Sequence, residues 1–245
     1  MMIIKQLEIW AFCWSCLNSR VSGNSTKPDT DNKQTCKKMD NYRKYFTKSI
    51  KDNYPNEFDK VIADTDNHYI NISTDTKFAS TSSNPIDRRL DFSSYFLAFI
   101  KTLDEKGETF DTIRKICLEI VTEYVQPKSK LHSFFKRLLP KLINTWFGQI
   151  IIKSFHKRVS VNPNTDGFIA NIITDKQETF GLGYGIDILE CGICKLFKKH
   201  NYQKYASILC EVDEITSGLA GLKLIRTGTI ANGAKKCDFR FKMKN

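Results

Sequence analysis

The segment 224–241, LIRTGTIANGAKKCDFRF, predicts a β-hairpin near the last residues of this 245-residue chain. Asn232-Gly233 favours a tight turn between two antiparallel strands, because the turn that matches the strand twist needs positive φ at both central residues. Side chains alternate between the faces of a strand, so Cys237 is expected to point inward, as a small core residue or as part of a site. The second strand would carry Cys237, Phe239 and Phe241 on one face and Asp238, Arg240 and Lys242 on the other.

The patterns ahead of this hairpin change from helical to strand-like along the chain. The polar segment 64–84 is expected to form a long loop or a poorly ordered insertion. Helices followed by strands predict an α+β fold with a helical N-terminal half, then a largely antiparallel sheet with one long helix and a closing C-terminal β-hairpin. Helical spacing of apolar residues marks 87–104, 110–124 and 193–219, and β-branched and aromatic residues with glycines at bends mark strands in 167–175 and 179–191.

Length and composition predict one domain over residues 39–245, preceded by a disordered or weakly ordered tail over 1–38. The chain is 41% hydrophobic, enough for one core, whereas 18–38 is polar and interrupted by Gly and Pro. Eight cysteines without the spacing of a disulfide framework favour free thiols and a cytoplasmic protein. The apolar run 9–17 lacks a following cleavage site, and no segment is long and uncharged enough to span a membrane, so neither a signal peptide nor a transmembrane helix is expected.

Residues 126–159 supply most of the formal net charge of +11 and contain no acidic residue. Apolar residues recur there at helical spacing, which predicts an amphipathic helix kinked at Pro140. Such a helix can lie on an anionic membrane, but its aromatic residues are numerous enough to serve a core. We expect it to pack on the C-terminal sheet through Phe134, Leu138 and Trp146, with neither a membrane nor nucleic acid as partner. The basic residues are Lys128, Lys130, Lys136, Arg137, Lys141, Lys153, Lys157 and Arg158.

A cysteine stands on the polar side of the helix expected near 202–219. Cysteine is among the most buried residue types, so this side is either simply exposed or lines a polar pocket made with another element. Projection at 100° per residue places Tyr205, Ile208, Leu209, Val212, Ile215 and Leu219 on one side and Cys210, Asp213, Glu214 and Ser217 on the other.

Two CxxC pairs, Cys13/Cys16 and Cys191/Cys194, are weak indications of zinc or redox chemistry. The histidines are scattered without metal-ligand spacing, so surface or packing roles are expected for them. They are His68, His132, His156 and His200.

The segments DILEC (187–191), LFKKH (196–200), LCEVDE (209–214) and 218–241 together resemble the family of L-2-amino-thiazoline-4-carboxylic acid hydrolases. The resemblance is carried best by 167–242. It implies a cytoplasmic hydrolase of cysteine metabolism that opens a thiazoline carboxylate ring to a carbamoyl-cysteine-type product. The chain departs from the family's pattern in charge, at Asp187, Glu190, Ile225, Ala234 and Lys235.

The resemblance implies a site in which Cys210 or a water attacks an sp² carbon bonded to nitrogen and sulfur. Asp213 would act as base or orienting carboxylate, and Arg226 would bind the substrate carboxylate, with Cys191 and Cys237 lining the pocket. Carboxylates beside a thiol favour its protonated form, so a thiol nucleophile, a carboxylate-activated water and a zinc-bound water all stay open. No cofactor is otherwise expected. The alternative is a non-catalytic small-molecule-binding module with packed cysteines or a structural metal.

Overall fold

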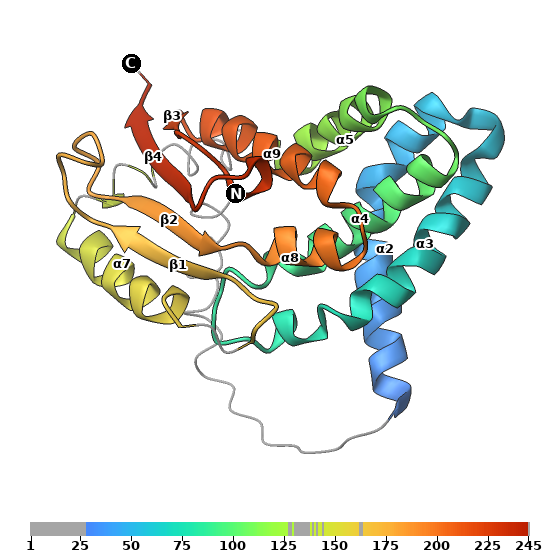
Figure 1. The fold of residues 1–245 in the computed structure, drawn as a ribbon, viewed down its shortest axis with the longest axis horizontal. Coiled ribbons are helices and arrows are strands. Elements are labelled where there is room, and N and C mark those ends of the chain that lie inside the picture. The colour runs from blue at the N-terminus through green and yellow to red at the C-terminus, as the bar shows by residue number, and fades with distance from the viewer. Residues whose placement is uncertain are drawn as a thin grey trace.

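The computed structural model describes residues 28–126, 145–161 and 164–244 together with residues 129, 138, 140, 142 and 143, with side chains from Met39 onward. Predictions for Cys13, Cys16, His132 and Phe134 lie outside the described residues. Within them the predicted α+β fold is confirmed, with helices first and an antiparallel sheet after them (Figure 1). The helices are α2 (Pro28–Asn53), α3 (Phe58–Thr74), α4 (Arg89–Glu105), α5 (Phe110–Val125), α7 (Trp146–Val159), α8 (Gly192–Lys199) and α9 (Ala206–Leu219), and the strands are β1 (Ile169–Ile173), β2 (Gly185–Glu190), β3 (Leu222–Ile225) and β4 (Cys237–Met243).

Helix α4 forms the centre of the helical half. Twelve of its seventeen residues are buried, so the helix is enclosed nearly all round by its neighbours. It packs against α3, α5 and α8 (Figure 1). Aromatic rings fill the space toward α2, where Phe46 contacts Phe92, Tyr95 and Phe99. The predicted helices over 87–104 and 110–124 are thus confirmed as α4 and α5.

The four strands form one antiparallel sheet in the order β1-β2-β4-β3. Strand β4 has Leu224 of β3 opposite Phe241 and Ile186 of β2 opposite Phe239. The predicted alternation is confirmed, because Cys237 and the two phenylalanines of β4 are buried while the residues between them are partly exposed. Helices α8 and α9 lie between the sheet and the rest of the helical half (Figure 1).

The connection between β3 and β4 spans residues 226–236 and is longer than the predicted two-residue turn. It contains the 3₁₀ helix η4 (Ile230–Asn232), and within the Asn-Gly dipeptide only Gly233 has a positive φ, +88°. The Asp238 carboxylate accepts hydrogen bonds from the N–H and the hydroxyl of Thr227 and so fixes the start of the loop. The hairpin is therefore confirmed and the tight turn is wrong, because side-chain hydrogen bonds organise a wider loop.

The prediction of a loop over 64–84 is wrong. Helix α3 continues to Thr74, and a 3₁₀ helix, η2 (Lys77–Ser80), follows it. Thr65, Tyr69 and Ile72 recur at helical spacing and are buried. The polar composition concealed this periodicity, since the side of α3 that is buried also carries polar residues, Thr65, Asp66 and Ser73.

The basic stretch 126–159 contains a helix boundary at Thr145. The Thr145 hydroxyl accepts a hydrogen bond from the N–H of Gly148 at 3.2 Å, and α7 begins there. Trp146 is 70% exposed, so the prediction that it packs on the sheet is wrong. Only one side of α7 faces β1, and that side carries the buried residues Ile152, Phe155 and Val159.

Two helices occupy the stretch 193–219, where one was predicted. Helix α8 ends before Asn201, which has a φ of +64°, and the 3₁₀ helix η3 (Gln203–Tyr205) leads into α9. Backbone with positive φ cannot continue an α-helix, so the single long helix is wrong.

Helix α2 begins at Pro28 and runs across Met39, the predicted start of the domain. The division into 1–38 and 39–245 stays a prediction, because residues 1–27 lie outside the described part. None of the helices described has the length and apolar character needed to cross a membrane.

Candidate active site

Helix α9 presents Asp213 to two arginines from distant parts of the chain. Arg89, the first residue of α4, donates a hydrogen bond from Nη2 to Asp213 Oδ1 at 3.0 Å. Arg226, which follows β3, has Nη1 3.9 Å from Asp213 Oδ2. Asp213 is buried, and the two cations offset the cost of taking its charge out of water. The polar side of α9 around Asp213 is therefore buried against other elements and not exposed.

Arg226 is held less tightly than Arg89. Its hydrogen bonds to the carbonyl oxygen of Cys210 are 3.4 and 3.5 Å long, and its guanidinium carbon lies 5.3 Å from the centre of the Phe239 ring. These contacts orient the guanidinium plane but are long for hydrogen bonds. Of the two arginines, Arg226 is thus the better suited to exchange its contacts for those of an anionic ligand, since a planar guanidinium can bind a carboxylate through two hydrogen bonds.

Cys191 occupies the N-cap position of α8, at the end of β2. The Cys194 thiol follows one helical turn further on. Interaction with this thiol, the nearby backbone N–H groups of Cys194 and Ile193, and the charge of Arg89 together lower the pKa of Cys191 against the opposing effect of burial. Interaction with Cys191 and burial raise the pKa of Cys194. The CxxC pair thus consists of a thiolate-favouring cysteine and a thiol that keeps its proton.

Cys210 and Cys237 are in the opposite electrostatic situation. Burial and the nearby charge of Asp213 raise the pKa of Cys210 to about 12. Burial likewise raises the pKa of Cys237 to about 11, although its sulfur accepts a hydrogen bond from the N–H of Ile230 at 3.1 Å. Both groups are thiols at neutral pH.

The thiols and charges described above lie close together, because Arg226 contacts Asp213, the carbonyl oxygen of Cys210 and the ring of Phe239, which is two residues from Cys237. Cys191 affects the pKa of Cys194, Cys210 and Cys237, and Arg226 and Asp213 act on the last two. All five site residues predicted from the sequence therefore gather in one region of the fold. They are Cys191, Cys210, Asp213, Arg226 and Cys237.

Sequence reasoning did not predict Arg89 as a site residue, and it considered Cys194 only as part of a CxxC pair with a weak indication of zinc or redox chemistry. Arg89 belongs to a basic pair at the start of a largely buried helix, which was a usable signal, but its partner Asp213 lies 124 residues further along the chain. Cys194 had the CxxC spacing. At the start of a helix, this spacing places the second thiol beside the first.

No group of three or more His, Cys, Asp and Glu side chains in the described part of the chain is arranged to hold a metal ion. The described histidines have other partners. His68 contacts Glu105, His200 contacts Asp75, and the Nδ1 of His156 accepts a hydrogen bond from a backbone N–H of β1. The cysteines Cys117, Cys191, Cys194, Cys210 and Cys237 are all free thiols.

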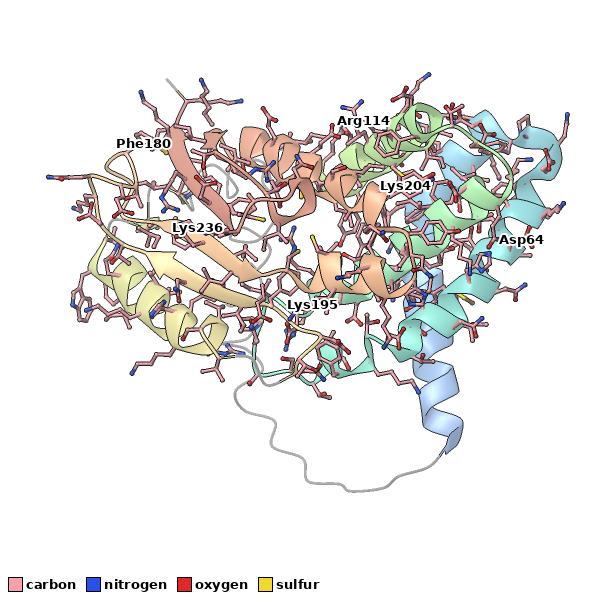
Figure 2. All side chains as sticks on the ribbon, viewed as in Figure 1. Asp64, Arg114, Phe180, Lys195, Lys204 and Lys236 are labelled. Carbon is pink, nitrogen blue, oxygen red and sulfur yellow. The ribbon has the colours of Figure 1, made fainter. Side chains whose placement is uncertain are left out.

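Two acidic residues of β2 that depart from the family's pattern have basic partners. Asp187 accepts hydrogen bonds from Lys236 at 2.6 Å and Arg240 at 2.8 Å, and Glu190 accepts one from Lys195. Lys195 and Lys236 are labelled in Figure 2. Burial raises the pKa of Asp187, but the two hydrogen bonds hold it below its usual range. These charges are thus neutralised within the sheet region.

The cluster combines the groups that covalent catalysis on a small carboxylate needs. Cys191 can supply a nucleophile, Cys194 a proton, and Arg226 a binding partner for a carboxylate. The pairing of Asp213 with two arginines makes it suited to orienting them, because both of its oxygens face cations.

Comparison with known proteins identifies the family of the chain. No curated protein and no solved structure matches the chain. The family model of L-2-amino-thiazoline-4-carboxylic acid hydrolase matches residues 88–241, which is well over half of the chain. The matched segment begins just before Arg89 and includes the four cysteines of the site, Cys191, Cys194, Cys210 and Cys237. The chain therefore belongs to the L-2-amino-thiazoline-4-carboxylic acid hydrolase family.

Proposed function

We propose that this protein hydrolyses a small cyclic amidine-like acid of the thiazoline carboxylate type, and that Cys191 is the attacking thiol. The observation that carries the proposal is the position of Cys191, which stands at the N-cap position of α8, three residues before Cys194 and within reach of the charge of Arg89. The family membership supports the substrate class. A thiazoline carboxylate also suits the cluster chemically, because it has an electrophilic carbon and one carboxylate.

The reaction would proceed in two balanced steps. The Cys191 thiolate adds to the carbon of the ring C=N bond, whose electron pair moves to nitrogen; the C=N bond then re-forms as the bond from that carbon to the ring sulfur breaks. Bonding of Cys191 removes the charge that raises the pKa of Cys194, so the Cys194 thiol can give its proton to the released substrate thiolate. Water then adds to the enzyme-bound carbon, giving one proton to the substrate nitrogen and one to Cys194, and the Cys191 thiolate leaves, which yields an N-carbamoylcysteine-type product. One water is consumed per ring opened, and no redox partner is needed.

The arginines and Asp213 would position the substrate in this scheme. Arg226 would turn from its long contacts to the substrate carboxylate, while Arg89 keeps its 3.0 Å hydrogen bond to Asp213. Asp213 would hold both guanidinium groups at the site. In the alternative thiol assignment, Cys210 would be the nucleophile, but it is disfavoured because Asp213 and burial raise its pKa to about 12.

A non-catalytic binding module is the second candidate. It is favoured by the burial of Cys237 in the core and the partial burial of Cys210, which would both serve packing in that case. Such a module would bind a thiazoline carboxylate through Arg226 without consuming it.

The test is incubation of the full chain with L-2-amino-thiazoline-4-carboxylic acid, followed by product analysis by mass spectrometry. We expect ring opening by the parent protein, a loss of at least about a thousandfold in kcat for Cys191→Ser, equivalent to about 4 kcal/mol, and a much smaller loss for the matched Cys210→Ser. Full activity of Cys191→Ser would refute the thiol assignment. Saturable binding without turnover by the parent protein would instead support the binding module.

A further inference from the structure

Helix α7 carries an exposed aromatic and aliphatic patch at its first turns. Trp146, Phe147 and Ile150 are 70%, 71% and 48% exposed. The two rings pack edge-on against each other with centroids 4.7 Å apart, so they form one surface. Large apolar side chains gathered in this way on a surface indicate an interaction site.

The same side of α7 continues into basic residues. Lys153 and Lys157 are exposed and follow Ile150 at spacings of three and seven residues, which places them on the side that Trp146 begins. The opposite side, with Ile152 and Phe155, is buried toward β1. The inner side of α7 is therefore part of the core. Its outer side is apolar at the N-terminal end and cationic at the C-terminal end.

Charge complementarity indicates the partner. No acidic residue occurs from Gln126 to Thr165, so the residues that precede and follow the patch along the chain are all neutral or basic. Helix α7 also lies at the edge of the molecule beyond β1, away from α2 and α3, where a large surface can approach it (Figure 1). An extended anionic surface with an apolar layer beneath it would attract the lysines through its charge and accept the aromatic and aliphatic side chains in its apolar layer.

We propose that the outer side of α7 docks on an anionic lipid surface, with Trp146, Phe147 and Ile150 entering the interface and Lys153 and Lys157 contacting the headgroups. This proposal replaces the expectation from the sequence that the stretch has no membrane partner, because that expectation required Trp146 to pack on the sheet and Trp146 is exposed. Tryptophan and phenylalanine are favoured at the boundary between headgroups and acyl chains, and lysines near an anionic leaflet add to binding. A second copy of the chain fits less well, because self-association through this side would bring like charges together. Nucleic acid fits less well too, because its phosphate backbone would form no favourable contact with the aliphatic side chain of Ile150.

The first arm of the test is co-sedimentation of the full chain with vesicles of phosphatidylcholine, with and without phosphatidylserine, at physiological salt. We expect binding only when phosphatidylserine is present and its loss in high salt. The double variant Trp146→Ser/Phe147→Ser should weaken binding by about tenfold or more. The matched control is Ile70→Ser, since Ile70 is 51% exposed on α3, and it should leave binding unchanged.

The second arm removes charge. Lys153→Gln and Lys157→Gln should each weaken binding by about fivefold, whereas Lys115→Gln, at an exposed position of α5, should not. Circular dichroism confirms that each variant is folded. Absence of binding to phosphatidylserine vesicles, equal binding by the double variant, or a dimer that the double variant dissociates would each overturn the proposal.

Discussion

Two arginine–carboxylate pairs connect α9 to the helical half, and they differ mainly in burial. Arg89 of α4 binds Asp213 with side chains that are 16% and 10% exposed. Arg114 of α5 binds Glu211 with side chains that are 43% and 35% exposed. If Asp213 is held at the site by a buried ion pair, Arg89→Gln should destabilise the protein far more than the matched Arg114→Gln.

The expected magnitude follows from what Arg89→Gln leaves behind. Removing one partner of a buried pair typically costs about 3 to 5 kcal/mol, because the remaining charge is uncompensated. Here Arg226 stays 3.9 Å from Asp213 and offsets part of that cost. We therefore expect a loss of about 2 kcal/mol, which corresponds to a fall in Tm of about 4 to 8 °C for a domain of this size.

Thermal and urea unfolding of the two variants, at low and high salt, measure this difference. The effect of Arg114→Gln should be small and should disappear in high salt, since an exposed pair is screened. The effect of Arg89→Gln should persist. Equal shifts for the two variants, or a complete loss of the Arg89→Gln effect in high salt, would refute the reasoning.

Three further variants test other parts of the fold. Gly167→Ala should lower stability by about 2 kcal/mol in urea unfolding, because its Cβ would lie 2.7 Å from Oδ1 of the buried Asp87. Asp187→Asn should lower the free energy of unfolding at neutral pH and make it fall less steeply as the solution is acidified. The pKa of Asp187 is depressed in the folded state, so the ionised carboxylate contributes fully to stability above the ordinary aspartate pKa of about 3.9, and this contribution is lost as the pH falls below that value. Cys237→Ser should cost about 1 kcal/mol by thermal unfolding, since its buried sulfur accepts the Ile230 N–H.

The fold could be predicted where residues alternate or recur with a clear period. The burial of Cys237, Phe239 and Phe241 in β4 follows from the alternation of side chains along a strand. The helix over 110–124 follows from apolar residues that recur at helical spacing. The loop over 226–236 could not be predicted, because the Asp238 carboxylate that organises it acts across eleven residues. The helix through 64–74 was concealed because polar residues occur on its buried side as well as on its outer side.

The candidate site could be predicted in part. Periodicity identified Cys210 and Asp213 as neighbours on α9, and the family resemblance added Arg226. The contact of Arg89 with Asp213 could not be predicted, since it depends on how α4 and α9 pack. The contrast between Cys191 and Cys210 also depends on tertiary structure, because it is set by a helix N-terminus for one thiol and by a buried carboxylate for the other.

Acid quenching of the full chain during incubation with L-2-amino-thiazoline-4-carboxylic acid, followed by peptide mapping by mass spectrometry, tests the central claim most directly. The account predicts an adduct of substrate mass on the peptide that contains Cys191, together with appearance of the ring-opened product, and loss of both in Cys191→Ser. Ring opening with an adduct on Cys210, or undiminished ring opening by Cys191→Ser, would contradict it.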